Sequence, residues 1–267
     1  MEGDNYEKQR HALFHGFTPV VGESAFTMFN RIELASPEVE KRMEHEYIKV
    51  AEDRDISLLQ LRNPMLATFL GRVYEYRALE AIAQRSPGES FMSRFAGVWE
   101  GPPYNVAFAS NSNETESRFI FPVTDSNLKS FKNLSEVEPG HTLYIPKNSN
   151  NPSYDGLIVS QGSLAERPQL VFLQTKRISP DSMGKISFEL SGIIKACRHF
   201  GLLKRTENNE PSKVKLCFVQ QSDSFEISRP LGFLKFNGAL LADEVWPQIE
   251  MIEVCVDLWN VTRRRVD

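Results

Sequence analysis

The sequence is poor in the residues that build disulfide frameworks and structural metal sites. It has three cysteines among 267 residues, and neither their odd number nor their spacing fits a disulfide framework or a zinc site. We therefore expect Cys197, Cys217 and Cys255 to be buried and reduced. The five histidines also lack the spacing of a zinc site.

Long apolar runs and several catalytic motifs are missing as well. No run approaches the ~18 apolar residues of a membrane helix, and the polar start MEGDNYEKQRHALF has no secretory core. We expect a soluble, intracellular protein without membrane contact. Because no G-x-x-x-x-G-K-[ST] and no G-x-S-x-G occurs, a P-loop and a serine-hydrolase elbow are excluded.

The charge balance has little excess of either sign. A formal net charge of −4 argues against a basic coat for sequence-independent nucleic-acid binding. A local basic cleft remains compatible with it, because net charge averages over the whole surface. With 41% hydrophobic and 25% charged residues the chain is expected to be globular.

Two helices are expected in the N-terminal third. Ser36-Pro37 begins a charged helix over 36–61, and Asn63-Pro64 begins a second, more apolar helix that ends near Pro87-Gly88. We place a domain boundary between them. Residues 1–62 form an N-terminal helical extension, and residues 63–267 form the main domain.

The remainder of the chain alternates strands and helices. Short apolar runs predict strands over 106–110, 118–123, 141–146, 157–159, 169–175 and 213–220. Apolar residues from Ile186 to Phe200 fall at helical spacing and predict a helix there. The middle and C-terminal parts read helix, strand, strand, strand, helix, strand, which indicates an α/β fold with a mixed central sheet.

One predicted hairpin gathers polar residues at its open end. Asp155 directly precedes the first strand, while Gln174 and Lys176 end the second and point to one face. In an antiparallel pair these residues become neighbours. An ordinary hairpin accounts for them, with Asp155 as a turn former. The alternative is a magnesium site in which Asp155 and Gln174 supply oxygen ligands and Lys176 serves the attacking water or the phosphate.

A resemblance favours the second interpretation. The stretch LYIPKNSNNPSYDGLIV, followed by LVFLQTK, resembles the PD-(D/E)XK nuclease superfamily. It is most similar to the nuclease-type domain of Crinkler effectors and retrotransposon hot spot proteins, through Asn151-Pro152 before Asp155 and through Gln174-x-Lys176. The helix segment GRVYEYRALEAI resembles the family's glutamate-bearing helix. Helical geometry leaves Glu75 and Glu80 open, and the resemblance selects Glu75.

The resemblance implies a restriction-endonuclease-like fold and a metal-dependent nuclease. Glu75, Asp155 and Gln174 would hold Mg²⁺ or Mn²⁺, and Lys176 would assist hydrolysis of a nucleic acid, DNA before RNA. The resemblance also implies a separate NTPase domain as a protein partner. It further implies that the protein acts as an effector or is associated with a mobile element. Since Gln174 replaces an acid, a catalytically inactive module that binds protein or chromatin is the alternative.

Basic residues follow the hairpin and could meet a phosphate backbone. We expect nucleic-acid contacts from a set of five, namely Arg177, Lys185, Lys195, Arg198 and Lys204. A solvated helix face with its cations near the helix C-terminus is the alternative explanation. The C-terminal Arg263-Arg264-Arg265 is a solvated tail or a weak nuclear-import signal.

Overall fold

The computed structural model divides the chain into two units, Met1–Val73 and Tyr74–Asp267. The structure describes residues 17–19, 32–34, 67–86, 88–101, 107–109, 116–122, 128–147, 151–161, 168–176, 186–203, 214–225 and 230–258. The boundary therefore falls later than the predicted one between residues 62 and 63, and it lies within a helix.

The N-terminal unit differs from the predicted helical extension in the part that is described. Strands β1 (Phe17–Pro19) and β2 (Ile32–Leu34) pair antiparallel. The helix predicted over 36–61 lies outside the described residues. A three-residue strand carries too short an alternation to be separated from loop by periodicity, which is why both strands were missed.

The second predicted helix is present as α4 (Ala67–Ala83). Its buried residues Tyr74, Ala78, Leu79 and Ile82 recur at helical spacing and form one apolar stripe. The helix ends shortly before Gly88, which adopts a φ of +81° that glycine tolerates without strain. Among the described helices, none has the length and apolarity needed to cross a membrane.

The second unit is built on an eight-stranded mixed sheet with the order β5-β3-β13-β11-β9-β8-β7-β6. In that order, the strands are β5 (Ser117–Phe119), β3 (Phe91–Trp99), β13 (Ile249–Cys255), β11 (Val214–Gln220), β9 (Gln169–Lys176), β8 (Gly156–Ser160), β7 (Leu143–Pro146) and β6 (Leu128–Phe131). A short 3-10 helix, η3 (Leu134–Glu136), follows β6. The sequence predicted neither β3, β6 nor β13, since polar residues interrupt each apolar run.

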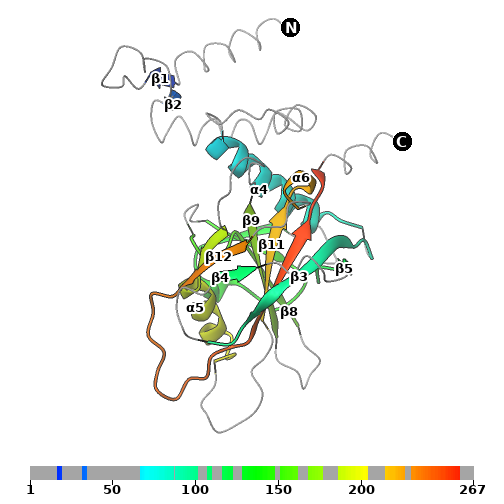
Figure 1. The fold of residues 1–267 in the computed structure, drawn as a ribbon. Coiled ribbons are helices and arrows are strands. Elements are labelled where there is room, and N and C mark those ends of the chain that lie inside the picture. The colour runs from blue at the N-terminus through cyan, green and yellow to red at the C-terminus, as the bar shows by residue number, and fades with distance from the viewer. Residues whose placement is uncertain are drawn as a thin grey trace, which may run out of the picture. The chain divides into compact units, whose positions relative to one another are not determined.

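The centre of this sheet is parallel. Strand β11 pairs parallel with both β9 and β13, whereas β8 pairs antiparallel with β9. The hairpin predicted from the sequence is therefore confirmed as β8 and β9. The carboxyl ends of β9, β11 and β13 point to one side of the sheet, where α6 (Ser222–Phe225) lies (Figure 1). Six consecutive residues of β9 are buried, as expected for a parallel strand covered on both faces.

The segment from Ile186 to Phe200 is not one helix, as predicted, but a strand followed by a helix. Strand β10 (Ile186–Glu189) precedes α5 (Ser191–His199). Apolar side chains at helical spacing also suit a strand when tertiary pairing is available. Here β10 pairs with β12 (Pro230–Lys235), which pairs with β4 (Ala107–Ala109) in a second, three-stranded sheet. Leu190 N–H then donates to the carbonyl of Lys235, at 2.7 Å.

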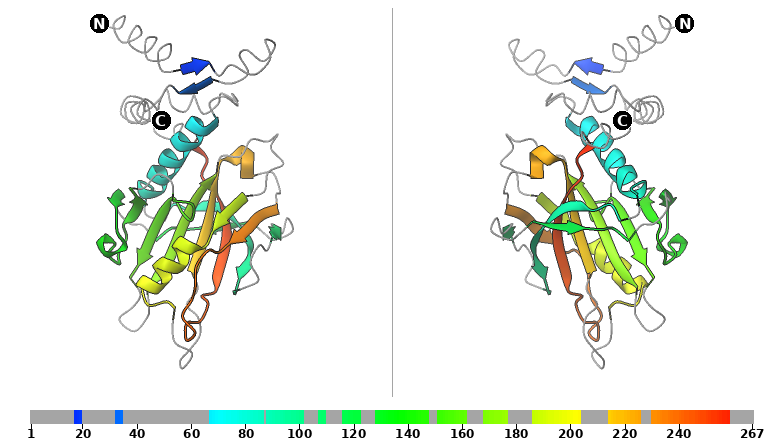
Figure 2. Two further views of the ribbon diagram at one scale, coloured as in Figure 1. Left: turned by 90° about the vertical axis from the view of Figure 1, so that its left-hand side faces the viewer. Right: turned by 90° about the vertical axis from the view of Figure 1, so that its right-hand side faces the viewer.

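Helices cover the two faces of the large sheet. Phe172 of β9 and Phe218 of β11 belong to one apolar core with Ile193 and Cys197 of α5. Figure 2 shows α5 in front of the strands in one view and behind them in the opposite view. On the other face, a Cβ on Gly156 would lie 3.1 Å from Leu79 of α4. Residues of β9 thus alternate between an α5 face and an α4 face.

Candidate active site

The carboxylate of Asp155 is bound to the end of β9. Its Oδ2 accepts hydrogen bonds from the main-chain N–H of Thr175, at 2.7 Å, and from the Thr175 hydroxyl, at 2.9 Å. The Asp155 N–H donates to the carbonyl of Leu173, at 2.8 Å. These contacts join the residue before β8 to the residue between Gln174 and Lys176, so the predicted proximity of Asp155 to this strand end is confirmed.

The surroundings of Asp155 oppose its ionisation. Burial raises the pKa of its carboxyl above the ordinary value, while the two Thr175 hydrogen bonds and the charge of Lys176 act in the opposite direction. A carboxylate in such a place gains from any further positive charge. A bound cation would supply that charge and favour the ionised form.

Gln174 carries an oxygen without a partner. The residue is 3% exposed, and its Oε1 is buried without a hydrogen bond. Because an unsatisfied buried carbonyl is unfavourable by ~1–3 kcal/mol, it calls for a partner. Register pairs Gln174 with Phe218, so its side chain points to the α5 face of the sheet.

Lys176 is the last residue of β9 and is half-buried. It shares a face with Gln174, as alternation requires, and Gln220 of β11 is its register neighbour. Its charge acts on Asp155 by lowering the pKa of that carboxyl. Lys176 therefore lies within electrostatic range of Asp155, as the site prediction requires.

Glu75 approaches from a different direction. It lies on α4, one turn before Leu79, and is half-buried. Leu79 contacts the α4 face of the sheet, beside Gly156, whereas Gln174 points to the α5 face. The structure therefore brings Asp155, Thr175 and the end of β9 together, but it does not bring Glu75 and Gln174 to one face.

A buried polar row that the sequence analysis missed crosses the α5 face at the same level. Register aligns Gln174 of β9 with Phe218, then with Glu253 of β13, and then with Arg94 of β3. Glu253 is 0% exposed and forms an ion pair with Arg94, yet its Oε1 has no partner.

Burial raises the pKa of Glu253, and the charge of Arg94 opposes the shift. The Arg94 guanidinium lies over the Phe225 ring, 4.6 Å from its centroid. A sequence signal existed, because Glu253 interrupts the apolar run IEMIEVC. The missed Thr175 gives no such signal, since threonine is common in strands.

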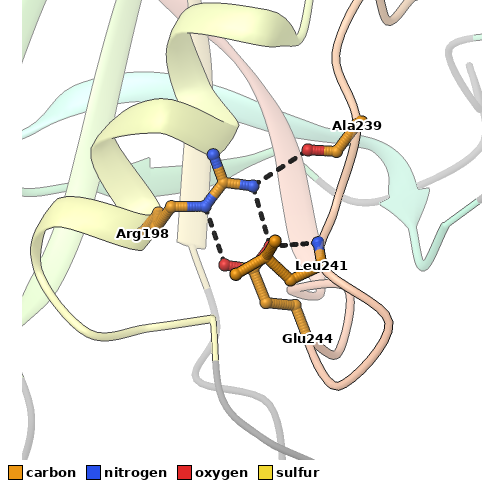
Figure 3. A network of polar contacts seen from close by, with 4 residues as sticks. All are labelled: Arg198, Ala239, Leu241 and Glu244. Carbon is orange, nitrogen blue, oxygen red and sulfur yellow. Dashed lines mark hydrogen bonds and ion pairs between the residues drawn. The ribbon is translucent and has the colours of Figure 1, made fainter.

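Two of the five predicted nucleic-acid contacts, Lys195 and Arg198, lie within the described residues. Arg177, Lys185 and Lys204 lie outside the described residues, whereas Lys195 is exposed on α5. Arg198 is paired with Glu244 through two hydrogen bonds of 2.7 Å, and it also donates to the carbonyl of Ala239, at 3.1 Å (Figure 3). Much of its charge is thus already balanced. The free cysteines are placed as expected, with Cys197 and Cys217 buried and Cys255 partly so.

The donor set for a cation is small. Among the described residues, no group of three or more His, Cys, Asp and Glu side chains is gathered in the way that a metal ion would need. The predicted magnesium ligands are two carboxylates and the amide oxygen of Gln174. They therefore do not include three side chains of the His, Cys, Asp and Glu type. Comparison of the chain with protein-family models, curated proteins and solved structures found no match.

Proposed function

We propose that the chain is a metal-dependent nuclease that hydrolyses phosphodiester bonds of nucleic acid, DNA before RNA, at the joined ends of β8 and β9. The observation that carries the proposal is the double hydrogen bond from Thr175 to Asp155. It fixes an acid beside a strand whose last residues are Gln174 and Lys176. An aspartate that served only to form a turn would gain no stability from burial of its carboxylate, because burial removes the hydrating water.

The order of elements supports a restriction-endonuclease-like core. Helix α4, strands β7, β8 and β9, helix α5 and strand β11 occur in this order in the chain, with β3 to β6 between α4 and β7 and with β10 between β9 and α5, and β7, β8, β9 and β11 are neighbours in the sheet. Strand β8 is antiparallel to both β7 and β9, whereas β9 and β11 are parallel. This pairing pattern supports the proposed core.

The residues at this strand end fit a hard cation. Mg²⁺ prefers oxygen ligands, and Asp155 and Gln174 each offer one, the Gln174 Oε1 being buried without a partner. Both would hold the ion. Glu75 of α4, which the resemblance also implies as a ligand, lies toward the other face of the sheet from Gln174 and is not proposed as one. When bound, the ion would polarise the phosphate and lower the pKa of a water ligand.

The side chains of this chain supply orientation and charge. Thr175 holds the Asp155 carboxylate in one position, because its main-chain N–H and its hydroxyl both donate to the same carboxylate oxygen. Lys176 places an ammonium group on the same strand end, where it can orient the attacking water and balance negative charge that develops on the phosphate. Burial around Asp155 keeps these interactions strong, because water does not screen them fully.

The test is hydrolysis of labelled single-stranded and duplex DNA and RNA by the purified chain with Mg²⁺ or Mn²⁺. Asp155→Asn and Lys176→Gln should each lower the rate by at least ~10²-fold, as loss of one electrostatic contact to a transition state does. Matched controls are Asp243→Asn and Lys215→Gln, which make the same chemical changes elsewhere in the second unit. They should leave the rate within about twofold, which is the usual effect of a change outside the site.

Calorimetry separates this function from that of an inactive nuclease-fold module. The wild-type chain should bind Mg²⁺ or Mn²⁺ with measurable heat, and Asp155→Asn should abolish it. Absence of both cleavage and metal binding, with wild-type stability retained, would refute the nuclease proposal and favour a protein-binding or chromatin-binding role.

A further inference from the structure

A groove of about 670 Å³ lies on the α5 side of the second unit. One wall is α5, through Gly192, Lys195 and His199. The other wall is formed by residues around η3, by Pro146 and Lys147, and by Asn151, Pro152 and Tyr154, the last of which directly precedes Asp155. The groove was not predicted, because its walls are far apart in the sequence.

The rim of the groove is cationic. Lys132, Lys147 and Lys195 are exposed and line it from different elements, together with His199. Among the described residues that line the groove, none is an aspartate or a glutamate. Arg198 also lines it, but Glu244 already balances its charge. The acidic chain thus has the local basic cleft that its net charge leaves open.

The acid that directly follows the lining residue Ser135 is already engaged. Glu136 of η3 accepts hydrogen bonds of 3.1 Å from the main-chain N–H groups of Lys132 and Asn133. These bonds, the one from Lys132 first, and the charge of Lys147 lower the pKa of Glu136. Glu136 therefore remains ionised and offsets part of the rim charge, but three lysines outnumber it.

The floor of the groove is apolar. Phe131 and Tyr154 are each 4% exposed, and Leu134 and Pro146 are half-buried beside them. Asn133 and Asn151 add amide groups to the lining. An apolar floor beneath a cationic rim matches a single strand of nucleic acid, whose bases need apolar and amide contacts while its phosphates need cations.

The size and place of the groove favour the same ligand. A volume near 670 Å³ lies within the ~300–1,000 Å³ of small-molecule pockets, so the groove has room for unpaired nucleotides. Tyr154 lies at the groove and is followed directly by Asp155. A strand in the groove would thus continue toward the candidate active site.

We propose that this groove binds a single-stranded segment of nucleic acid, with Lys132, Lys147 and Lys195 on its phosphates, and leads the adjoining phosphodiester to Asp155. The inference rests on the proposed function and deepens it, since it names unpaired nucleic acid as the form recognised. An acidic peptide would find the same cations but would not use the amide-lined apolar floor as bases would.

The experiment measures binding without cleavage. Fluorescence anisotropy follows a fluorescein-labelled oligothymidylate of about 12 nucleotides, within the length that single-strand grooves cover, added to full-length Asp155→Asn in EDTA. A duplex of equal length and a polyglutamate peptide compete with it. Titrations at about 50 to 200 mM salt give the dependence of affinity on ionic strength.

Matched double variants locate the site. Lys147→Gln/Lys195→Gln removes two exposed groove lysines from opposite walls, and Lys129→Gln/Lys235→Gln removes two exposed lysines that do not line the groove. The groove variant should bind at least ~10-fold more weakly, and its salt slope should fall by about 1.4, or about 0.7 for each lost phosphate contact. The control variant should bind within about twofold of the parent, because exposed charges outside the contact are screened.

Three results would overturn the inference: equal losses in both double variants, no loss in either, or competition by the duplex or polyglutamate as strong as by the single strand. Cleavage that depends on Asp155 together with unchanged binding in the groove variant would remove this inference and leave the proposed function standing. Groove-dependent binding without cleavage would do the reverse.

Discussion

Asp155 and Thr175 are twenty residues apart in the sequence, yet one carboxylate oxygen of Asp155 accepts both the main-chain N–H and the hydroxyl of Thr175, at 2.7 and 2.9 Å. The two hydrogen bonds satisfy one of the two carboxylate oxygens of Asp155, a residue that is largely buried from water. They also fix the direction of its other oxygen. Thr175 is thus a positioning residue for the candidate site, although only its neighbours matched a motif.

Replacing Thr175 with valine should change the pH dependence of activity. Valine keeps the shape but removes the hydroxyl, and the hydroxyl is one of the groups that lower the pKa of Asp155. The pKa should therefore rise further, and the acid limb of the pH–rate profile should move to higher pH if the ionised form is active. Thr175→Ser restores the hydroxyl and should return the profile. A purely structural role would lower the rate without moving the limb.

The Asp155 carboxyl should also make folding stability depend on pH. Its folded pKa is raised above the usual 3.8, so the folded chain binds this proton more tightly than the unfolded chain. The resulting stability is fully present below the usual value and is lost as pH rises through the folded pKa. Urea unfolding should therefore show that the metal-free wild type loses stability relative to Asp155→Asn as pH rises above the usual 3.8. A constant difference would contradict the shift.

The Arg198–Glu244 pair should behave as a surface ion pair rather than as a phosphate contact. Arg198→Gln should lower stability by no more than ~1 kcal/mol, since the Arg198 side chain is 43% exposed to solvent. It should weaken oligonucleotide binding less than Lys195→Gln does, because Glu244 already balances its charge. Anisotropy titrations compare the two variants, and a larger binding loss for Arg198→Gln would restore it as a nucleic-acid contact.

The same pair predicts a second pH effect of opposite sign. Hydrogen bonding to Arg198 lowers the pKa of Glu244 below the usual 4.5. Its contribution to stability is therefore present above that value and is lost as pH falls through the folded pKa. Wild type and Glu244→Gln should differ in urea midpoint near neutral pH and converge in acid. A difference that stays the same at all pH values would mean that the charge of Glu244 does not contribute to stability.

The Arg94–Glu253 pair should be far more costly to break. Glu253 is fully buried, so Glu253→Gln would leave the Arg94 guanidinium without its counter-charge and destabilise the fold by ~3–5 kcal/mol. The double variant Arg94→Met/Glu253→Leu removes both charges and should recover much of the loss. Urea unfolding of wild type, Arg94→Met, Glu253→Leu and the double variant closes a double-mutant cycle and gives the coupling energy. Additive losses would show that the two charges do not interact.

Gly192 should resist substitution because α5 approaches the chain that leads into Asp155. Its N–H donates to Ser153 Oγ, at 3.0 Å, and a Cβ at this position would lie 2.6 Å from that oxygen and 2.8 Å from Ser153 Cβ. Gly192→Ala should therefore destabilise by ~1–3 kcal/mol. Gly140→Ala meets nothing within 4 Å and serves as the matched control. Thermal unfolding measures both, and Ser153→Gly should partly rescue Gly192→Ala.

The sequence by itself determined the local elements where one period dominates. Alternation and flanking turn residues predicted β8, β9 and β11, and a helix-capping pattern predicted α4, because these signals depend only on neighbours in the chain. It also indicated Asp155, Gln174 and Lys176 as one group, since a hairpin fixes which strand ends meet. These predictions required no knowledge of distant contacts.

Tertiary structure decided what local patterns leave open. The split of residues 186–200 into β10 and α5 depends on pairing with β12, which lies beyond β11 in the sequence. The faces of the sheet separate Gln174 from the helix that carries Glu75. Glu253 and Arg94 meet only because β13 and β3 are neighbours, and the basic groove exists only where α5 packs beside β6 and β7. Each of these depends on contacts between residues far apart in the chain, which no local periodicity encodes.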